Sequence, residues 1–142
     1  MLVLDASAAA ELLLGRPPAP AVAAQLAAHA FDLHAPHLLD VEVLSVVRRL
    51  VASGDASVQR GEEAIDDLFA LPIERYPHDV LVRRAWDHRD NFSAHDATYL
   101  ALAEALAPEP APILTADARF ARAARGHAAV PVILVGTEPA PR

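Results

Sequence analysis

Short apolar segments of three or four residues alternate with longer segments of helical periodicity along most of this 142-residue chain. The first short segment, Leu2 to Leu4, ends directly before Asp5. A later one, Ile113 to Thr115, ends two residues before Asp117. Apolar runs of this length, each followed by a helix, are typical of strands in a parallel sheet, because helices cover both faces of such a sheet. The alternation therefore predicts a three-layer α/β/α fold with a mainly parallel central sheet.

The bounds of the expected elements follow from apolar spacing and from breaks at glycine and proline. We expect strands at residues 2–4, 31–34, 73–76, 113–115 and 132–135. We expect helices at residues 7–14, 20–29, 38–51, 57–70, 79–89, 93–107 and from 117 to 126. Because no linker or repeat interrupts this order, residues 1–135 are expected to form a single compact domain, followed by a flexible C-terminal tail at residues 136–142.

Composition limits the chemistry that the domain can use. Without cysteine, the chain can form no disulfide, thiolate zinc site or cysteine nucleophile. A formal net charge of −7 argues against broad affinity for nucleic acid, although an acidic metal site can still bring a phosphate to the protein. Neither a membrane span nor a signal peptide is recognisable. We therefore expect a soluble, cytoplasmic protein that binds any metal through oxygen or imidazole groups.

Asp5 and Asp117 lie at the carboxyl ends of two predicted strands. Ligands of open α/β sheets bind at this edge, so the two carboxylates are expected to meet there. Each aspartate also has a simpler interpretation as a helix cap or turn residue. Ser7 and Thr115, each two residues from one aspartate, could orient a carboxylate through a hydroxyl group, although capping is the simpler role for Ser7.

Two further acids occur in predicted helices. Glu42 lies on the flank of an apolar helix face and is expected to be partly buried, which requires protonation, a metal ion or an ion pair, for example with Arg49. Asp96 falls in the first turn of a helix that begins at Ser93, so a capping box is its alternative role. Gathered at one edge, the acids would repel one another unless cations compensate, and Mg²⁺ or Mn²⁺ suits such oxygen ligands. A site of this kind can hydrolyse phosphodiesters with metal-activated water.

Four stretches of the chain resemble PIN-domain ribonucleases, and in particular the VapC toxins of bacterial type II toxin–antitoxin pairs. They are LVLDASAAAELLLG, APHLLDVEVLSVVRRL, FSAHDATYLALAEAL and ILTADARFARA. The resemblance implies that Asp5, Glu42, Asp96 and Asp117 are the catalytic and magnesium-binding residues. It also implies endonucleolytic cleavage of RNA, a homodimer, and inhibition by a small VapB-like antitoxin protein.

The chain departs from these relatives in two places. Some relatives have a further acid near the fourth ligand, whereas Ala116, Ala118 and Arg119 surround Asp117 here, so one or two metal ions remain possible. His95 often corresponds to an aromatic residue, which favours a packing role over that of a catalytic base.

Other polar and aromatic residues have less specific patterns. A stripe at a spacing of three residues could bind RNA phosphates or form a solvated helix face; it consists of Arg119, Arg122 and Arg125. A second basic cluster with the same two interpretations consists of Arg83, Arg84 and Arg89. Trp86 and Tyr99 occur among apolar helical residues, which predicts packing rather than base stacking.

Three other functions compete with that of a nuclease. A haloacid-dehalogenase-type phosphatase needs a second aspartate where Ser7 stands, and a response-regulator receiver needs a lysine, which the chain lacks. A catalytically weak PIN-like module that only binds RNA or protein is the remaining alternative. Since that alternative would be expected to lose one of the acids, and all four are present, we expect an active enzyme.

Overall fold

The structure is a computed structural model that describes residues 1–106 and 108–136. Five parallel strands form one sheet in the order β3-β2-β1-β4-β5. Their bounds are β1 (Leu2–Leu4), β2 (Leu33–Pro36), β3 (Ile73–Tyr76), β4 (Ile113–Thr115) and β5 (Val132–Leu134). Apart from residue 136, the predicted C-terminal tail lies outside the described residues.

Helices connect these strands. Four helices, taken in chain order, cover one side of the sheet: α1 (Ala6–Leu13), α2 (Ala19–Ala28), α3 (Leu38–Ala52) and α4 (Val58–Ala70). A short 3-10 turn, η1 (His78–Val80), follows β3, and the later helices are α5 (Val82–Asp87), α6 (Ala94–Ala105) and α7 (Ala118–His127). No helix in the described part of the chain has the length and apolar character needed to cross a membrane.

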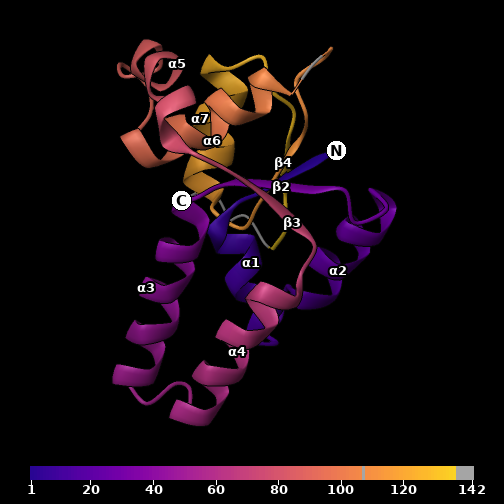
Figure 1. Ribbon diagram of the computed structural model, residues 1–142, viewed down its shortest axis with the longest axis vertical. Coiled ribbons are helices and arrows are strands. Elements are labelled where there is room, and N and C mark those ends of the chain that lie inside the picture. The colour runs from indigo at the N-terminus through magenta and orange to yellow at the C-terminus, as the bar shows by residue number, and fades with distance from the viewer. Residues whose placement is uncertain (107, 137–142) are drawn as a thin grey trace, which may run out of the picture.

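The sheet separates two hydrophobic cores. Side chains alternate along a strand, so Leu2 and Leu4 pack into one core while Val3 packs into the other. The first core contains residues of α1 to α4, and the second contains residues of α6 and α7. Figure 1 shows the corresponding layers, with α5, α6 and α7 grouped at one end of the view and α1 to α4 at the other. The expected three-layer fold is therefore confirmed.

The order of the strands creates a crevice at the carboxyl edge of the sheet. From the central strand β1, the chain adds β2 and β3 on one side before it returns to add β4 and β5 on the other. Parallel sheets bind ligands where the strand order reverses in this way, which is between β1 and β4 here. Asp5 directly follows β1, and Asp117 follows β4 by two residues. The topology thus brings these two aspartates to the same crevice.

Three local predictions were wrong. The second strand begins at Leu33 rather than at residue 31, because Ala30 and Phe31 form a turn with φ angles of 54° and 55°. The helix expected at 79–89 is divided into η1 and the short α5. The first helix begins at Ala6 with Asp5 at its N-cap, so Ser7 is not the capping residue.

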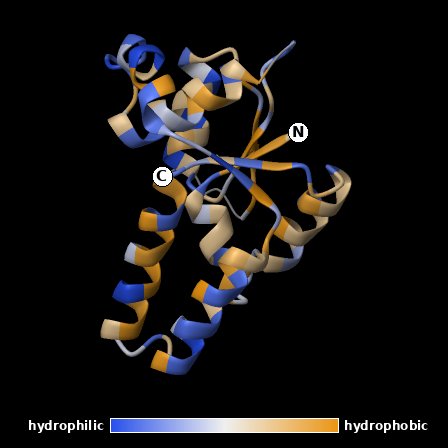
Figure 2. Ribbon diagram, in the orientation of Figure 1, coloured by the Kyte–Doolittle hydropathy of each residue, from blue (hydrophilic) through white to orange (hydrophobic). Residues whose placement is uncertain are grey.

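Helices α3 and α4 form a hairpin that extends away from the sheet (Figure 1). Gly61 allows the two helices to approach closely, because a Cβ atom at this position would lie 3.0 Å from a methyl group of Val51 and 3.2 Å from one of Val47. Hydrophobic residues occur along both helices of the hairpin (Figure 2). Some of them remain exposed, including Leu44 and Val58.

Candidate active site

A pocket of about 400 Å³ opens at the carboxyl edge of the sheet, where β1 and β4 end. The four acids that the sequence analysis selected all line it. They are Asp5, Glu42, Asp96 and Asp117. The remaining lining residues come from the first turn of α1, from α3 and from the first turn of α6. Acids that are up to 112 positions apart in sequence therefore face one cavity.

Asp5 is the most buried of these acids, with only 6% of its surface exposed. Its Oδ2 atom accepts two hydrogen bonds of 2.6 Å, one from the hydroxyl of Ser7 and one from that of Thr115. The two hydroxyl groups are 3.1 Å apart, and Ser7 Oγ also accepts the backbone N–H of Ala116 at 2.9 Å. Ser7 and Thr115 thus hold the carboxylate of Asp5 in a fixed position, and this network replaces the capping role expected for Ser7.

Glu42 reaches the pocket from the second turn of α3, and its side chain is 26% exposed. Tyr99 on α6 donates a hydrogen bond of 2.8 Å to Glu42 Oε1. Glu42 Oε2 lies 3.7 Å from His95 Nδ1. The expected partial burial is therefore confirmed, whereas the alternative pairing with Arg49 is wrong, since none of the described ion pairs joins these two residues.

Asp96 and Asp117 enter the pocket from the first turns of two helices. Ser93 is the N-cap of α6 and accepts the backbone N–H of Asp96 at 3.1 Å, as the capping motif predicts. The Asp96 carboxylate is not needed for this contact and lines the pocket. Asp117 is the N-cap of α7, and its Oδ1 accepts the backbone N–H groups of Arg119 and Phe120 at 2.9 and 3.3 Å. Asp117 thus combines capping with a place in the site, whereas Ser93 caps α6 and the Asp96 carboxylate lines the pocket.

Burial and mutual repulsion raise the pKa values of three of the acids. Burial is the main cause of the raised pKa of Asp5, to which the charge of Asp117 adds. Burial also raises the pKa of Glu42, and that of Asp96 to about 6, with further contributions from neighbouring carboxylates. Because each of these acids responds to the charge of another, the pocket has a local excess of negative charge, which favours a bound cation.

The donor set of the pocket fits a hard divalent cation, since it consists of carboxylates with hydroxyl groups behind them. In Asp5 and in Glu42, side-chain hydrogen bonds reach only one of the two carboxylate oxygens, namely Oδ2 of Asp5 and Oε1 of Glu42. However, among the described residues no group of three acidic or histidine side chains lies close enough together to hold a metal ion in the present rotamers.

Two residues of the site were not predicted as such. Tyr99 is completely buried, as expected for packing, but its hydroxyl also binds Glu42. It follows Asp96 by three positions, a spacing that places both on one helix face and would have indicated this role. His95 was expected to pack, yet its side chain is 66% exposed and lines the pocket.

The predicted basic stripe lies on α7, directly after Asp117. Arg119, Arg122 and Arg125 are all exposed, whereas Phe120 and neighbouring alanines form the buried face of the helix. The guanidinium of Arg119 lies 4.0 Å from Asp117 Oδ1. The stripe therefore begins beside Asp117, and a phosphate held at Arg119 would lie close to this acid.

Comparisons with known proteins agree with this geometry. The family model of the PIN domain matches residues 2–126. The chain is 41% identical to ribonuclease VapC9 of Mycobacterium tuberculosis over 135 residues, which cover 95% of this chain and 98% of that protein. It is 38% identical to ribonuclease VapC12 of the same organism over 127 residues, which cover 89% of this chain and 94% of the relative.

A solved structure gives independent support for the fold. The crystal structure of PAE2754 from Pyrobaculum aerophilum aligns with a TM-score of 0.63, covering 92% of this chain and 81% of its own, at 18% sequence identity. The similarity at this level of identity concerns the arrangement of strands and helices alone. Together with the family model and the relatives that match over almost their whole length, it leads to one conclusion: this chain belongs to the PIN domain family.

Proposed function

We propose that this protein is an endoribonuclease that depends on Mg²⁺ or Mn²⁺ and acts in the cytoplasm as the toxin of a toxin–antitoxin pair. The convergence of the four acids on one pocket, with raised pKa values for Asp5, Glu42 and Asp96, is the observation that supports this most strongly. The similarity to proteins named ribonuclease VapC supports RNA as the substrate. When bound, the metal ion would activate a water molecule for attack on the phosphodiester and neutralise charge on the phosphate.

The residues of the pocket have separate tasks in this proposal. Asp5 is held by the hydroxyl groups of Ser7 and Thr115, so it provides a carboxylate of fixed orientation at the base of the site. Glu42 is held through one oxygen by Tyr99, and Asp117 through one oxygen by the first N–H groups of α7. Each of these carboxylates thus keeps a defined position while its second oxygen can contribute to the cation site.

The first experiment measures cleavage of a fluorescent single-stranded RNA against the concentration of Mg²⁺ or Mn²⁺. We expect cleavage that EDTA abolishes, and loss of activity by at least about 100-fold in Asp5→Asn and Asp96→Asn with the fold retained. Asp66→Asn is a matched control, because Asp66 is an exposed carboxylate on α4 outside the acid pocket. Full activity in both site variants would contradict the proposal.

The arginines of α7 are proposed to bind RNA phosphates. Arg119 and Arg122 lie one turn apart on the exposed face of α7, immediately after the residue that caps the helix at the pocket. A backbone phosphate bound to them would place the next phosphodiester near the acids. The positive charge of these arginines would offset part of the repulsion between RNA and a chain of net charge −7. Arg125 continues the same stripe one turn further from the pocket.

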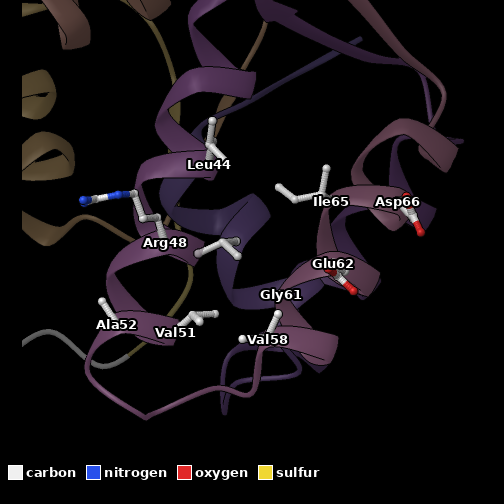
Figure 3. A pocket seen from close by; sticks show the side chains of 10 residues that line it. Leu44, Arg48, Val51, Ala52, Val58, Gly61, Glu62, Ile65 and Asp66 are labelled. Atoms are coloured by element: carbon white, nitrogen blue, oxygen red, sulfur yellow. The ribbon is translucent and has the colours of Figure 1, made fainter.

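The α3–α4 hairpin provides a candidate binding groove for a VapB-like antitoxin. A groove of about 520 Å³ is lined by both helices, and Figure 3 shows Leu44 and Val51 of α3 opposite Val58 and Ile65 of α4. The rims differ in charge, since Arg48 lies on the α3 side and two acids on the α4 side. The two acids on the α4 side are Glu62 and Asp66. An amphipathic segment with an apolar face and charged flanks complements such a groove.

The antitoxin would also reach the active site from this position. Helix α3 borders the groove through Leu44 and the acid pocket through Glu42 and Ser45. Val58→Glu in the groove should therefore abolish inhibition by an antitoxin while RNA cleavage is unchanged. We further propose a homodimer, which the resemblance to VapC toxins implies and which sedimentation at several protein concentrations would test.

A catalytically weak module that binds RNA or protein without turnover is the second candidate. The absence of a ready-made three-residue metal cluster among the described residues is the observation that favours it. This candidate predicts RNA binding in EDTA but no cleavage at saturating Mn²⁺. The same cleavage assay, run together with a binding assay, distinguishes the two functions.

A further inference from the structure

The chain has a single tryptophan, Trp86, and 62% of its surface is exposed. The expectation that this residue packs in the core was wrong, because α5 is only six residues long and directs none of its residues fully into the interior. The buried neighbour that anchors this region is Leu81, which precedes α5. The indole belongs to an exposed apolar patch with Val80 and Val82, and a contiguous patch of this kind often marks a binding site.

The indole borders two hollows on the surface. One, of about 340 Å³, contains apolar side chains of α5, the ring of Phe92 and the first turn of α6. Its α6 residues are Ala94, Ala97 and Thr98. Asp96 belongs to the same turn and faces the acid pocket. Since an α-helix is about 10 Å across, the hollow and the acid pocket lie on two sides of one helical turn, within reach of neighbouring nucleotides of one strand.

Arginine side chains accompany the indole in both hollows. The guanidinium carbon of Arg89 lies 4.8 Å from the centroid of the Trp86 ring, the geometry of a cation–π contact. The second hollow, of about 420 Å³, is lined by Trp86 and Arg83 but not by Arg89, so the guanidinium of Arg89 does not cover the indole on that side. Arg84 is engaged elsewhere, in an ion pair with Glu104.

The charges around Trp86 are balanced rather than basic. Asp79 lines the second hollow, Asp87 pairs with Arg84, and Asp90 lies 4.0 Å from Arg89. A surface with alternating charges and a central aromatic ring is not suited to strong phosphate binding by itself. It is suited to stacking of a base, because stacking depends on the ring face and on adjacent guanidinium planes and is tolerant of base identity.

We propose that Trp86, together with Arg89, is a stacking platform for an unpaired RNA base next to the scissile phosphodiester. The inference rests on the proposed function and adds the class of substrate: a single-stranded segment, one of whose bases leaves its neighbours to stack on the indole. The platform lies at the end of the molecule opposite the α3–α4 hairpin (Figure 1), so an antitoxin in the hairpin groove would not cover it.

A second copy of this chain is the other conceivable occupant of the exposed indole. Valines at positions 80 and 82 are also exposed here, which adds apolar surface. However, the ring lines two separate hollows and has the guanidinium of Arg89 beside it, which suits a planar ligand that stacks on the indole better than a flat protein face. The position beside the Asp96 turn also links the ring to the site of chemistry. RNA is therefore the occupant that the geometry favours.

Because Trp86 is the only tryptophan, intrinsic fluorescence reports on the platform directly. The experiment titrates the full chain in EDTA with a non-cleaved single-stranded oligoribonucleotide and, separately, with an abasic oligonucleotide of equal charge. We expect the indole emission to be quenched by the oligoribonucleotide at concentrations that match its Kd, and not by the abasic strand. No activity is needed, so the result is independent of metal.

Variants separate stacking from a structural role. Trp86→Ala is expected to weaken oligoribonucleotide binding about 10-fold, measured by anisotropy of a labelled strand, whereas Trp86→Phe should restore most of the affinity. Phe69→Ala is the matched control, since Phe69 is an exposed ring with Arg75 5.1 Å from its centroid. It precedes β3 at the amino edge of the sheet, away from the acids, and should bind RNA like the parent protein.

The outcomes distinguish this inference from the proposed function. RNA cleavage without quenching, or equal quenching by the abasic strand, would overturn the platform and leave the nuclease intact. Quenching without cleavage at saturating Mn²⁺ would support the platform while the proposed reaction fails. An emission maximum that shifts with protein concentration in the absence of RNA, and no longer responds to RNA, would assign the indole to a protein interface and overturn the inference.

Discussion

The hydroxyl of Tyr99 donates a hydrogen bond of 2.8 Å to Oε1 of Glu42, joining helices α6 and α3 at the wall of the acid pocket. Burial, with nearby carboxylates, raises the pKa of Tyr99, so the phenol stays protonated and acts as a donor. The hydrogen bond from Tyr99 by itself lowers the pKa of Glu42. Burial has the larger and opposite effect, so the pKa of Glu42 is raised. A fully buried tyrosine therefore positions an acid on a helix that is distant in sequence.

Tyr99→Phe removes this donor without changing the shape of the core. We expect a loss of about 1–2 kcal/mol in the free energy of unfolding, because Glu42 loses a hydrogen bond in a partly buried position. The Mg²⁺ concentration for half-maximal RNA cleavage should rise about 10-fold, since a displaced carboxylate binds the cation less well. Urea unfolding and a metal titration of cleavage measure the two effects.

The matched control is Tyr76→Phe. Tyr76 bonds His34 Nδ1 at 2.8 Å on β2 and β3 and does not line the acid pocket. We expect this variant to change stability alone, with an unaltered metal requirement. An equal change of the metal requirement in both variants would contradict a specific role for Tyr99.

Thr115 provides a second prediction, on the orientation of Asp5. Thr115→Val keeps the volume of the side chain but leaves Asp5 with Ser7 as its only hydroxyl donor. We expect a 10- to 100-fold loss of cleavage, with the loss restored by Thr115→Ser, which retains the hydroxyl group. If Thr115→Val cleaves RNA at the parent rate, the network around Asp5 is structural and does not serve the reaction.

Much of the site could be predicted from the sequence because its positions follow from local rules. Asp5 and Asp117 follow apolar strands, and parallel strands end at one edge. Glu42 follows from helical spacing, which gave its partial burial correctly. Asp96 was the least determined of the acids, because a capping motif explains its backbone contact without any role for the carboxylate.

The contacts that could not be predicted are those between helices whose relative packing cannot be inferred from the sequence pattern. The bond from Tyr99 to Glu42 spans 57 positions and depends on how α6 packs beside α3. The exposure of Trp86 depends on the shortness of α5, which the apolar pattern of residues 79–89 conceals. Side-chain periodicity describes one helix at a time, so it cannot tell which face is left without a neighbour.

Asp96→Asn gives a third prediction, on stability. Because the pKa of Asp96 is raised from 3.8 to about 6, the folded protein holds a proton between these pH values that the unfolded chain has released. The metal-free protein therefore loses stability as the pH rises through this window. Asp96→Asn removes the cost of the charge and should stabilise the metal-free protein near neutral pH by about 1–2 kcal/mol, allowing for solvent screening.

Metal binding should reverse this order. Mg²⁺ or Mn²⁺ is expected to raise the melting temperature of the parent protein but to have a much smaller effect on Asp96→Asn. Cleavage should decline as the pH falls below about 6, since protons compete with the cation for the carboxylates. Thermal melts with and without EDTA across this pH range provide the measurement, and a metal-free variant that is no more stable than the parent near neutral pH would refute the charge argument.

The exposed arginines of α7 give the last prediction, which concerns how RNA binds rather than how it is cleaved. A contact between an arginine and a phosphate releases a counterion, so affinity for a single strand falls with salt by a logarithmic slope of about 0.7 for each contact. Arg119 and Arg122 are exposed on the α7 face that begins at Asp117. The double variant Arg119→Gln/Arg122→Gln should therefore lower the salt slope by about 1.4 and leave base-dependent quenching of Trp86 in place.

The matched control is Arg16→Gln/Arg60→Gln, near the ends of α1 and α4. It removes the same charge away from the acid pocket and should leave the slope unchanged. Since net charge changes equally in both double variants, only a contact at α7 can make their slopes differ.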